Sequence, residues 1–209
     1  MVHLSGPKLG PGLVERLRAG DEAAFRELID AYHARLIRLA LGFVETRAAA
    51  EEVVQDTWLG VVKGLPTFEQ RASLKTWIFS ILINRARSRG AREGRHRDVF
   101  VDQATVMGVG ATDFTAEGRW SSPPTPWETP LVERALSDRR ALERLAEALD
   151  QLPQQQRAVV VLRDVEGLDG SEVCNVLGIT ETNQRVLLHR GRTRLRAVLA
   201  DVIEDLKGC

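Results

Sequence analysis

The segment from residue 98 to residue 131 constrains the fold of this chain most, because it separates two stretches with helical patterns. It holds the runs MGVGATDF and SSPPTPWETP, rich in Gly, Ser, Thr and Pro. Proline removes a backbone donor and disfavours a helical conformation in the preceding residue. A structureless segment of this length is unusual inside one compact domain. We therefore predict two small domains, over 13–97 and 132–205, with a flexible lead over 1–12 and a flexible linker over 98–131.

The first half has apolar residues at spacings of three and four, the pattern of amphipathic helices. A short helix ends at Gly20, and Asp21 is a suitable N-cap for the next helix. A third helix runs from about residue 47 to 64, and a fourth starts after Ser73. The inward stripes of the last three helices are expected at Phe25, Leu28, Ile29, Tyr32, Leu36, Leu39 and Phe43, then Val54, Trp58, Val61, Val62 and Leu65, then Leu74, Trp77, Ile78 and Ile81.

The second half begins with a strongly amphipathic helix that carries Leu136, Leu142, Leu145 and Leu149. Pro153 suits the first turn of another helix, which passes through three consecutive valines (159–161) to Gly167. No strand alternation is seen in the first half, so this half is expected to be all-α. The three valines have strand propensity, but the segment is read as a helix, and the whole chain is therefore expected to be all-α.

The run LDGSEVCNVLGITETNQRVLLHRGR predicts a helix, a tight turn and a second helix. Asp169 and Glu172 match a capping box, and Gly178 supplies the turn. Thr180 can cap the second helix, whose residues 188, 195, 198 and 202 fall on its packed side. Arg185, His189, Arg192 and Arg196 fall on another side, where they can reach base edges and phosphates. A solvated basic helix without a partner is the alternative, but the capped first helix and the turn favour nucleic acid.

The charges balance overall, with 29 basic and 29 acidic residues, but they are unevenly placed. Arginines concentrate in 84–97 and again in 180–196, whereas 98–133 is acidic. Two basic islands around an acidic segment suggest polyanion contacts in two places. The two cysteines, Cys174 and Cys209, show neither metal-ligand spacing nor a disulfide framework, so we expect reduced cytosol and no cofactor. No apolar run approaches the length of a membrane span, and the lead lacks the apolar region of a signal peptide.

The chain as a whole resembles the sigma-70 family of bacterial RNA polymerase sigma factors, of the extracytoplasmic function (ECF) type. The runs DEAAFRELIDAYHARLIRLA, AEEVVQDTW and FEQRASLKTWIFSILINRARSR are similar to sigma region 2. The runs LPQQQRAVVVLRDVEGL, EVCNVLGIT and LLHRGRTRLR are similar to sigma region 4. The resemblance covers about residues 13–97 and 132–203 in the order of the family. It implies a non-catalytic initiation subunit that binds core polymerase, through its β′ clamp helices and β flap, and promoter DNA.

The resemblance also implies residue roles. Glu52, Gln55 and Asp56 would contact the β′ clamp helices; a solvated helix face is the alternative. The segment 67–75 matches a loop that captures a base flipped from the −10 element, and Asn84 matches a base-reading position. The residues expected at the −10 element are Arg71, Lys75, Asn84, Arg85, Arg87, Arg89 and Arg92. Those expected at the −35 element are Thr182, Asn183, Gln184, Arg185, His189, Arg190 and Arg192. The family also implies an anti-sigma factor.

Some features remain open at this stage. Asn183–Gln184 replaces a small or apolar pair that is common in the family, and it either widens the base-reading surface or loosens the helix packing. The linker is either a plain tether or a segment that enters a polymerase channel. Trp58, Trp77 and Cys174 are interpreted as core residues. The rival functions are a free-standing helix-turn-helix regulator, which would not need the VVQDTW helix, and a helical scaffold that binds an acidic protein.

Overall fold

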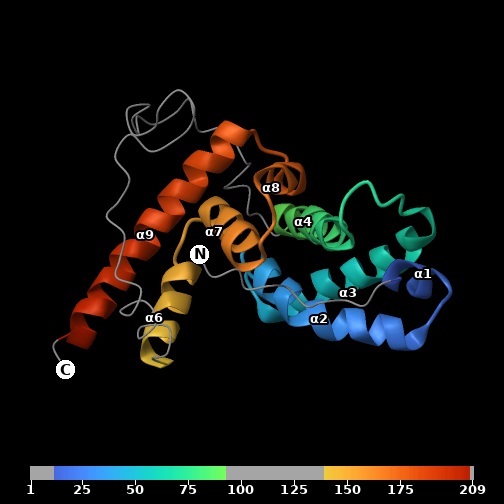
Figure 1. The fold of residues 1–209 in the computed structure, drawn as a ribbon, viewed down its shortest axis with the longest axis horizontal. Coiled ribbons are helices and arrows are strands. Elements are labelled where there is room, and N and C mark those ends of the chain that lie inside the picture. The colour runs from blue at the N-terminus through green and yellow to red at the C-terminus, as the bar shows by residue number, and fades with distance from the viewer. Residues whose placement is uncertain (1–11, 93–138, 208–209) are drawn as a thin grey trace.

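The computed structural model describes residues 12–92 and 139–207, and every regular element in these residues is a helix (Figure 1). The first domain contains α1 (Leu13–Arg18), α2 (Glu22–Ala40), α3 (Arg47–Gly64), the 3₁₀ turn η1 (Leu65–Thr67) and α4 (Leu74–Arg92). The second contains α6 (Arg139–Asp150), α7 (Gln154–Val160), the π-helical turn η5 (Val161–Val165), α8 (Gly170–Leu177) and α9 (Glu181–Lys207). The all-α, two-domain prediction is confirmed. The predicted lead and linker lie outside the described residues.

Side-chain caps start three helices of the first domain, and two of them, Asp21 and Ser73, are the predicted residues. Asp21 Oδ1 accepts hydrogen bonds from the backbone nitrogens of Ala23 (2.9 Å) and Ala24 (3.3 Å). Thr46 Oγ1 and Ser73 Oγ do the same at the starts of α3 and α4, each at 3.1 Å. Gly20, just after α1, has φ 79°, a left-handed conformation that suits glycine. The boundaries of these helices are thus determined by local chemistry.

The core of the first domain lies between α2, α3 and α4. Its fully buried side chains include Leu28, Leu36, Val54, Ile78, Phe79, Leu82 and Ile83. Two predicted core residues are wrong, because Ile29 is 39% exposed and Val62 is 53% exposed. Ile29 follows buried Leu28 and Val62 follows buried Val61. Consecutive residues on a helix point about 100° apart, so each of these two side chains turns away from the buried face. On α3 the buried face instead passes through Val53, Val54, Thr57 and Val61.

Trp77 and Trp58 both pack against this core, as predicted. The ring of Trp77 stacks on that of Phe68, with centroids 4.6 Å apart. The indole nitrogen of Trp58 donates a hydrogen bond to His33 Nδ1 at 3.3 Å. Neither ring is therefore a free stacking platform for a base in this arrangement.

In the second domain, α9 packs along α6 and α7. Pro153 is the N-cap of α7, and the three valines lie buried in helical backbone, so they form no strand. Gly191 allows α9 to approach α7 closely, because a Cβ at this position would lie 2.6 Å from Val160 Cγ2. On α6, Leu145 and Leu149 are half-buried, whereas Leu142 is 45% exposed. Leu136 and Val202 have no described side chain.

The predicted helix-turn-helix is formed by α8 and the start of α9. Both halves of the capping box are present: Asp169 Oδ1 accepts from Glu172 N at 2.8 Å, and Glu172 Oε2 accepts from Asp169 N at 2.9 Å. Gly178 has φ 60°, and Thr180 Oγ1 accepts from Asn183 N at 3.2 Å. These contacts position α9 relative to α8 and define which side of α9 faces outward.

Candidate nucleic-acid interface

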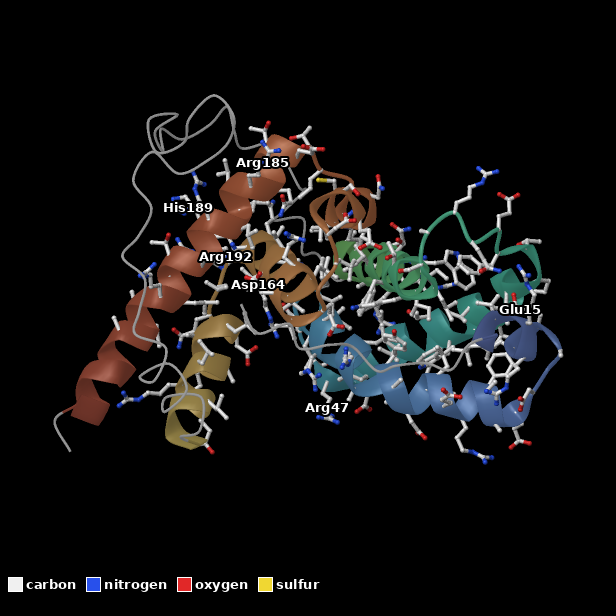
Figure 2. The ribbon with its side chains drawn as sticks, viewed as in Figure 1. Glu15, Arg47, Asp164, Arg185, His189 and Arg192 are labelled. Atoms are coloured by element: carbon white, nitrogen blue, oxygen red, sulfur yellow. The ribbon has the colours of Figure 1, made fainter. Side chains whose placement is uncertain are left out.

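The outward side of α9 carries the predicted base-reading arginine. Thr182, Arg185 and Arg192 are exposed, and His189 and Arg190 are half-buried. Figure 2 shows Arg185, His189 and Arg192 in succession along α9, with Asp164 beside Arg192. Arg185 pairs with Glu181 one turn earlier, at 3.1 Å. Because that contact uses only part of the guanidinium group, Arg185 keeps donors for a ligand.

Arg192 is held by a two-point contact with Asp164, which follows α7. Its Nε donates to Oδ2 at 2.9 Å and one of its terminal nitrogens donates to Oδ1 at 2.5 Å. This hydrogen bond raises the pKa of Arg192, so the side chain stays charged. A bidentate contact fixes the plane of the guanidinium group. Arg192 therefore presents its remaining donors in a fixed orientation, a feature that the sequence did not reveal.

Asn183 and Gln184 do not face outward, and their assignment to a DNA-facing surface is corrected. Asn183 is 2% exposed and Gln184 is 5% exposed. They share the packed face of α9 with Leu187, Leu188 and Gly191, at helical spacing. Gln184 lies against the start of α8, with Oε1 3.7 Å from the position a Cβ on Gly170 would take. Of the two alternatives that the sequence leaves open for this pair, the structure supports packing.

The predicted −10 residues divide into exposed and engaged groups. Asn84, Arg85 and Arg92 are exposed, as is Arg71, which pairs with Glu69 at 2.6 Å. Arg89 pairs with Glu52 of α3 at 2.5 Å. Lys75 and Arg87 are half-buried against the second domain, and burial lowers the pKa of each. The structure therefore brings part of this group to the surface and places Lys75 and Arg87 in a contact between domains.

The loop before α4 borders a cavity of about 590 Å³. The cavity is lined by one residue of α1, five of the loop, three of α4 and three of α8: Val14, Phe68, Gln70, Arg71, Ala72, Ser73, Leu74, Thr76, Ser80, Ser171, Glu172 and Asn175. Within the loop Gln70 has φ 55°, a left-handed conformation that is uncommon outside glycine. The segment predicted to capture a flipped base thus faces a hollow that the second domain partly walls.

The outer face of α3 combines acidic and apolar groups. Glu52, Gln55 and Asp56 are exposed as predicted. Leu59 (57% exposed) and Val62 (53% exposed) continue the same side of the helix over the next two turns. Exposed apolar side chains rimmed by polar ones are typical of protein docking sites. Helical spacing places Val62 with the core, so the sequence does not indicate this exposed apolar pair.

Cys174 is half-buried, and burial raises the pKa of its thiol, which favours the unreactive protonated form. Within residues 12–92 and 139–207, no three His, Cys, Asp or Glu side chains form a cluster that could hold a metal ion. Over the same ranges, none of the helices has the length and apolar character needed to cross a membrane.

Two family models match the chain: Sigma-70 region 2 over residues 28–96 and Sigma-70, region 4 over residues 142–195, together more than half of it. The ECF RNA polymerase sigma factor SigE of Mycolicibacterium smegmatis is 32% identical over 184 residues, 87% of this chain and 65% of the relative. The chain belongs to the sigma-70 family and is an RNA polymerase sigma factor of the ECF type. Sigma region 2 corresponds to α2–α4, and sigma region 4 to α6–α9.

Other relatives agree with this membership. The ECF sigma factor SigM of Mycobacterium tuberculosis is 29% identical over 181 residues, 87% of this chain and 80% of the relative. Among solved structures, the sigma factor RpoE in complex with the anti-sigma factor NepR from Bartonella quintana has a TM-score of 0.56 and 23% identity. The structural match covers 84% of this chain and 96% of the RpoE chain. This structural similarity supports the fold.

Proposed function

We propose that this sigma factor binds core RNA polymerase, directs it to promoters with −35 and −10 elements, and assists strand opening without being catalytic itself. The observation that carries the proposal is the outer face of α3, where Asp56 and Gln55 adjoin exposed Leu59 and Val62. A free-standing helix-turn-helix regulator has no need for such a face, and neither does a scaffold whose arginines alone bind a partner.

Polymerase docking is assigned to Glu52, Gln55 and Asp56, with Leu59 and Val62 as apolar contacts. Among the described residues, Asp56 has no ion pair or hydrogen-bonding side-chain partner, so its charge is available to a basic partner surface. Glu52 is shared, because it pairs with Arg89 in the free chain. Exposed apolar area next to a charge gives both affinity and orientation to a docking contact.

Promoter contact is assigned to two separate faces. On α9, Thr182, Arg185 and His189 are the base readers, while Arg190 and Arg192 contact phosphates. On region 2, Asn84 reads a base of the −10 element, and Arg71, Lys75, Arg85, Arg87, Arg89 and Arg92 hold the backbone of the melted strand. Asn183 and Gln184 support α9 from the packed side and are not included among the base readers.

We further propose that an anti-sigma factor holds this protein in the cytoplasm and covers its polymerase-binding surfaces. The family resemblance supports this partner, and the solved relative RpoE was crystallised with an anti-sigma factor. The β flap of polymerase is the proposed contact of region 4.

Copurification with core polymerase tests the docking face. Asp56→Arg should abolish the complex, because it reverses a charge at the centre of the α3 face. Asp30→Arg, the same charge change on an exposed position of α2, is the matched control and should leave binding intact. Equal recovery of core polymerase with both variants would remove the role assigned to α3.

Run-off transcription with core polymerase on a promoter library tests the whole function. We expect transcripts from templates that share a −35 and a −10 sequence. DNA binding by the free protein with no polymerase-dependent transcription would favour the regulator, and absence of DNA binding at low salt would favour the scaffold.

A further inference from the structure

The loop over residues 68–73, which is proposed to capture a −10 base, is held by a helix far from it in the sequence. In Figure 1, α1 lies at the end of α3 from which this loop leaves. Arg18, the last residue of α1, donates from Nε to the carbonyl of Leu65 at 3.3 Å and from a terminal nitrogen to the carbonyl of Phe68. Leu65 begins η1 and Phe68 directly follows it. One guanidinium group therefore spans the 3₁₀ turn and holds the start of the loop.

The two ends of the loop are fixed, whereas its middle is exposed. Phe68 is 6% exposed, its ring stacks on Trp77, and its backbone nitrogen donates to the carbonyl of Leu65 at 3.2 Å. At the other end, Ser73 Oγ accepts from a backbone nitrogen in the first turn of α4 at 3.1 Å. Residues 69–72 lie between these supports and are exposed. The direction in which they leave the first domain is thus determined at Phe68 and Ser73.

The exposed middle of the loop contains a strained residue. Gln70 has φ 55°, and a non-glycine residue keeps such a conformation only where its surroundings hold it. Its side chain reaches back to α1, where Nε2 donates to Glu15 Oε1 at 3.5 Å, a long hydrogen bond. Arg71, a proposed −10 contact, comes next and pairs with Glu69 at 2.6 Å. The backbone at Gln70 therefore decides where the charge of Arg71 lies.

The helix α1 can support the loop because it is itself anchored. Leu13 is 5% exposed and Leu17 is 2% exposed. Arg16 pairs with Asp21 at 2.8 Å and with Glu27 of α2 at 3.3 Å. These contacts all lie within the first domain, so they do not depend on the position of region 4. The helix α1 thus connects the loop to α2.

We propose that Arg18 is a positioning residue for base capture: it holds the loop 68–73 in its receiving shape before DNA arrives and thereby sharpens the preference for one base of the −10 element. This inference rests on the proposed function, which takes the loop to capture a base. Flipping a base costs stacking energy, and a loop that had to be ordered at the same moment would add to that cost. The match to Sigma-70 region 2 begins at residue 28, so the supporting helix α1 lies before it.

Arginine suits this role because its planar group offers several donors in a fixed fork. Arg18→Gln removes the contacts with both carbonyls. Arg18→Lys keeps the positive charge but places all donors on one nitrogen, which cannot span Leu65 and Phe68 in the same way. If Arg18 only attracted phosphates, lysine would replace it. The control is Arg26→Gln, the same charge loss at an exposed position of α2, where Arg26 pairs with Glu22 at 2.7 Å.

Limited proteolysis of the free full chain by a glutamate-specific protease measures the loop without polymerase or promoter. Cleavage after Glu69, quantified by mass spectrometry, should become about tenfold faster in both Arg18 variants, because cleavage follows the population of the opened loop. It should keep the wild-type rate in Arg26→Gln. Cleavage after exposed Glu147 of α6 is the internal reference and should have one rate in all of these proteins. An unchanged rate at Glu69 in both Arg18 variants would overturn the proposal.

Run-off transcription by the holoenzyme on a library randomised over the −35 and −10 elements measures base preference. In both Arg18 variants, the preference at one −10 position should fall about tenfold, because the loop must then be ordered during capture. The preference at the base assigned to Asn84 and over the −35 element should keep its wild-type value, as should every preference in Arg26→Gln. Arg18 is exposed, so its replacement is expected to leave the fold of the domain intact.

Three further results would contradict the inference. A loosened loop with wild-type preference at every −10 position would remove the positioning role. Wild-type behaviour of Arg18→Lys would show that a cation alone suffices, and an equal loss of preference at all positions would indicate a general structural role. A wild-type holoenzyme that yields no transcript, while proteolysis shows a loosened loop in the variants, would contradict the proposed function alone.

Discussion

Replacing Gln184 with methionine distinguishes a base-reading role from a packing role at this position. Gln184 is 5% exposed, and nothing among the described residues accepts a hydrogen bond from its Nε2. A buried donor without a partner costs about 1–3 kcal/mol. Methionine has a similar length and helix propensity but carries no donor. Gln184→Met should therefore stabilise region 4 by about 1 kcal/mol, taking the lower end of that range to allow for imperfect packing.

Thermal unfolding followed by circular dichroism measures the first consequence. A gain of about 1 kcal/mol raises the melting temperature of a domain of this size by about 4–8 °C. Selection from a −35 promoter library measures the second, and the preferred sequence should not change. Arg185→Ala is the matched comparison one residue away on the exposed side. It should lower −35 affinity by about 1–3 kcal/mol if it pairs with a guanine.

The opposite pattern would refute the reasoning. If Gln184→Met loses base preference at the −35 element while its melting temperature stays the same, the side chain must leave the packed face to read DNA. The position of Gln184 against α8 would then not describe the DNA-bound protein. A lower melting temperature with unchanged preference would keep the packing role but show that the amide is satisfied in solution.

Three further predictions address the supports of α9. Gly191→Ala should destabilise region 4 by about 1–2 kcal/mol in urea unfolding, because the added Cβ would lie 2.6 Å from Val160 Cγ2. This overpacking outweighs the gain in helix propensity from glycine to alanine. A stabilised variant would contradict the close approach of α9 to α7. Asp164→Ala should weaken −35 binding several-fold without changing base preference, because it removes only the carboxylate that orients Arg192. Footprinting of library-selected promoters measures both the binding and the preference. A changed base preference would contradict a purely orienting role for Asp164. The backbone hydrogen bond from Glu172 lowers the pKa of Asp169 below its ordinary 3.8. The stability that this cap contributes is therefore present above about pH 4 and is lost as the pH falls through the lowered pKa. The acid unfolding curve of Asp169→Asn should lack this loss of stability, and wild-type and variant curves of identical shape would refute the prediction.

The local elements of the fold were predictable because their causes are local. Asp21, Ser73 and Thr180 cap helices in the structure as their positions in the sequence indicate. The third helix has the bounds predicted for it. The capping box of Asp169 and Glu172 has both of its hydrogen bonds. Each of these features depends on residues three or four apart, so one short window of sequence contains all the required information.

The margins of the packed faces were not predictable in the same way. Helical spacing identifies the centre of an apolar stripe, but the neighbouring helices decide how far burial extends on either side. Ile29 and Val62 lie beyond that limit, and both are exposed. Asn183 and Gln184 show the converse error, because a polar residue type suggests an outward face whereas both of these side chains are buried. Their spacing with Leu187 and Leu188 was the available signal, and it indicates the packed side.

The use of Lys75 and Arg87 illustrates a deeper limit of sequence reasoning. A cation on α4 can donate to a phosphate, to a carboxylate or to the carbonyl end of a helix, so residue type cannot choose among them. In the structure, Arg87 donates to the carbonyl of Leu177, and Lys75 donates to the carbonyl of Glu166 and lies near its carboxylate. Both partners belong to region 4, far along the chain from α4. A capping residue and its target lie within one helical turn, so a short window of sequence contains both of them. The partners of Lys75 and Arg87 are set by how two domains pack, and no short window of sequence contains that information.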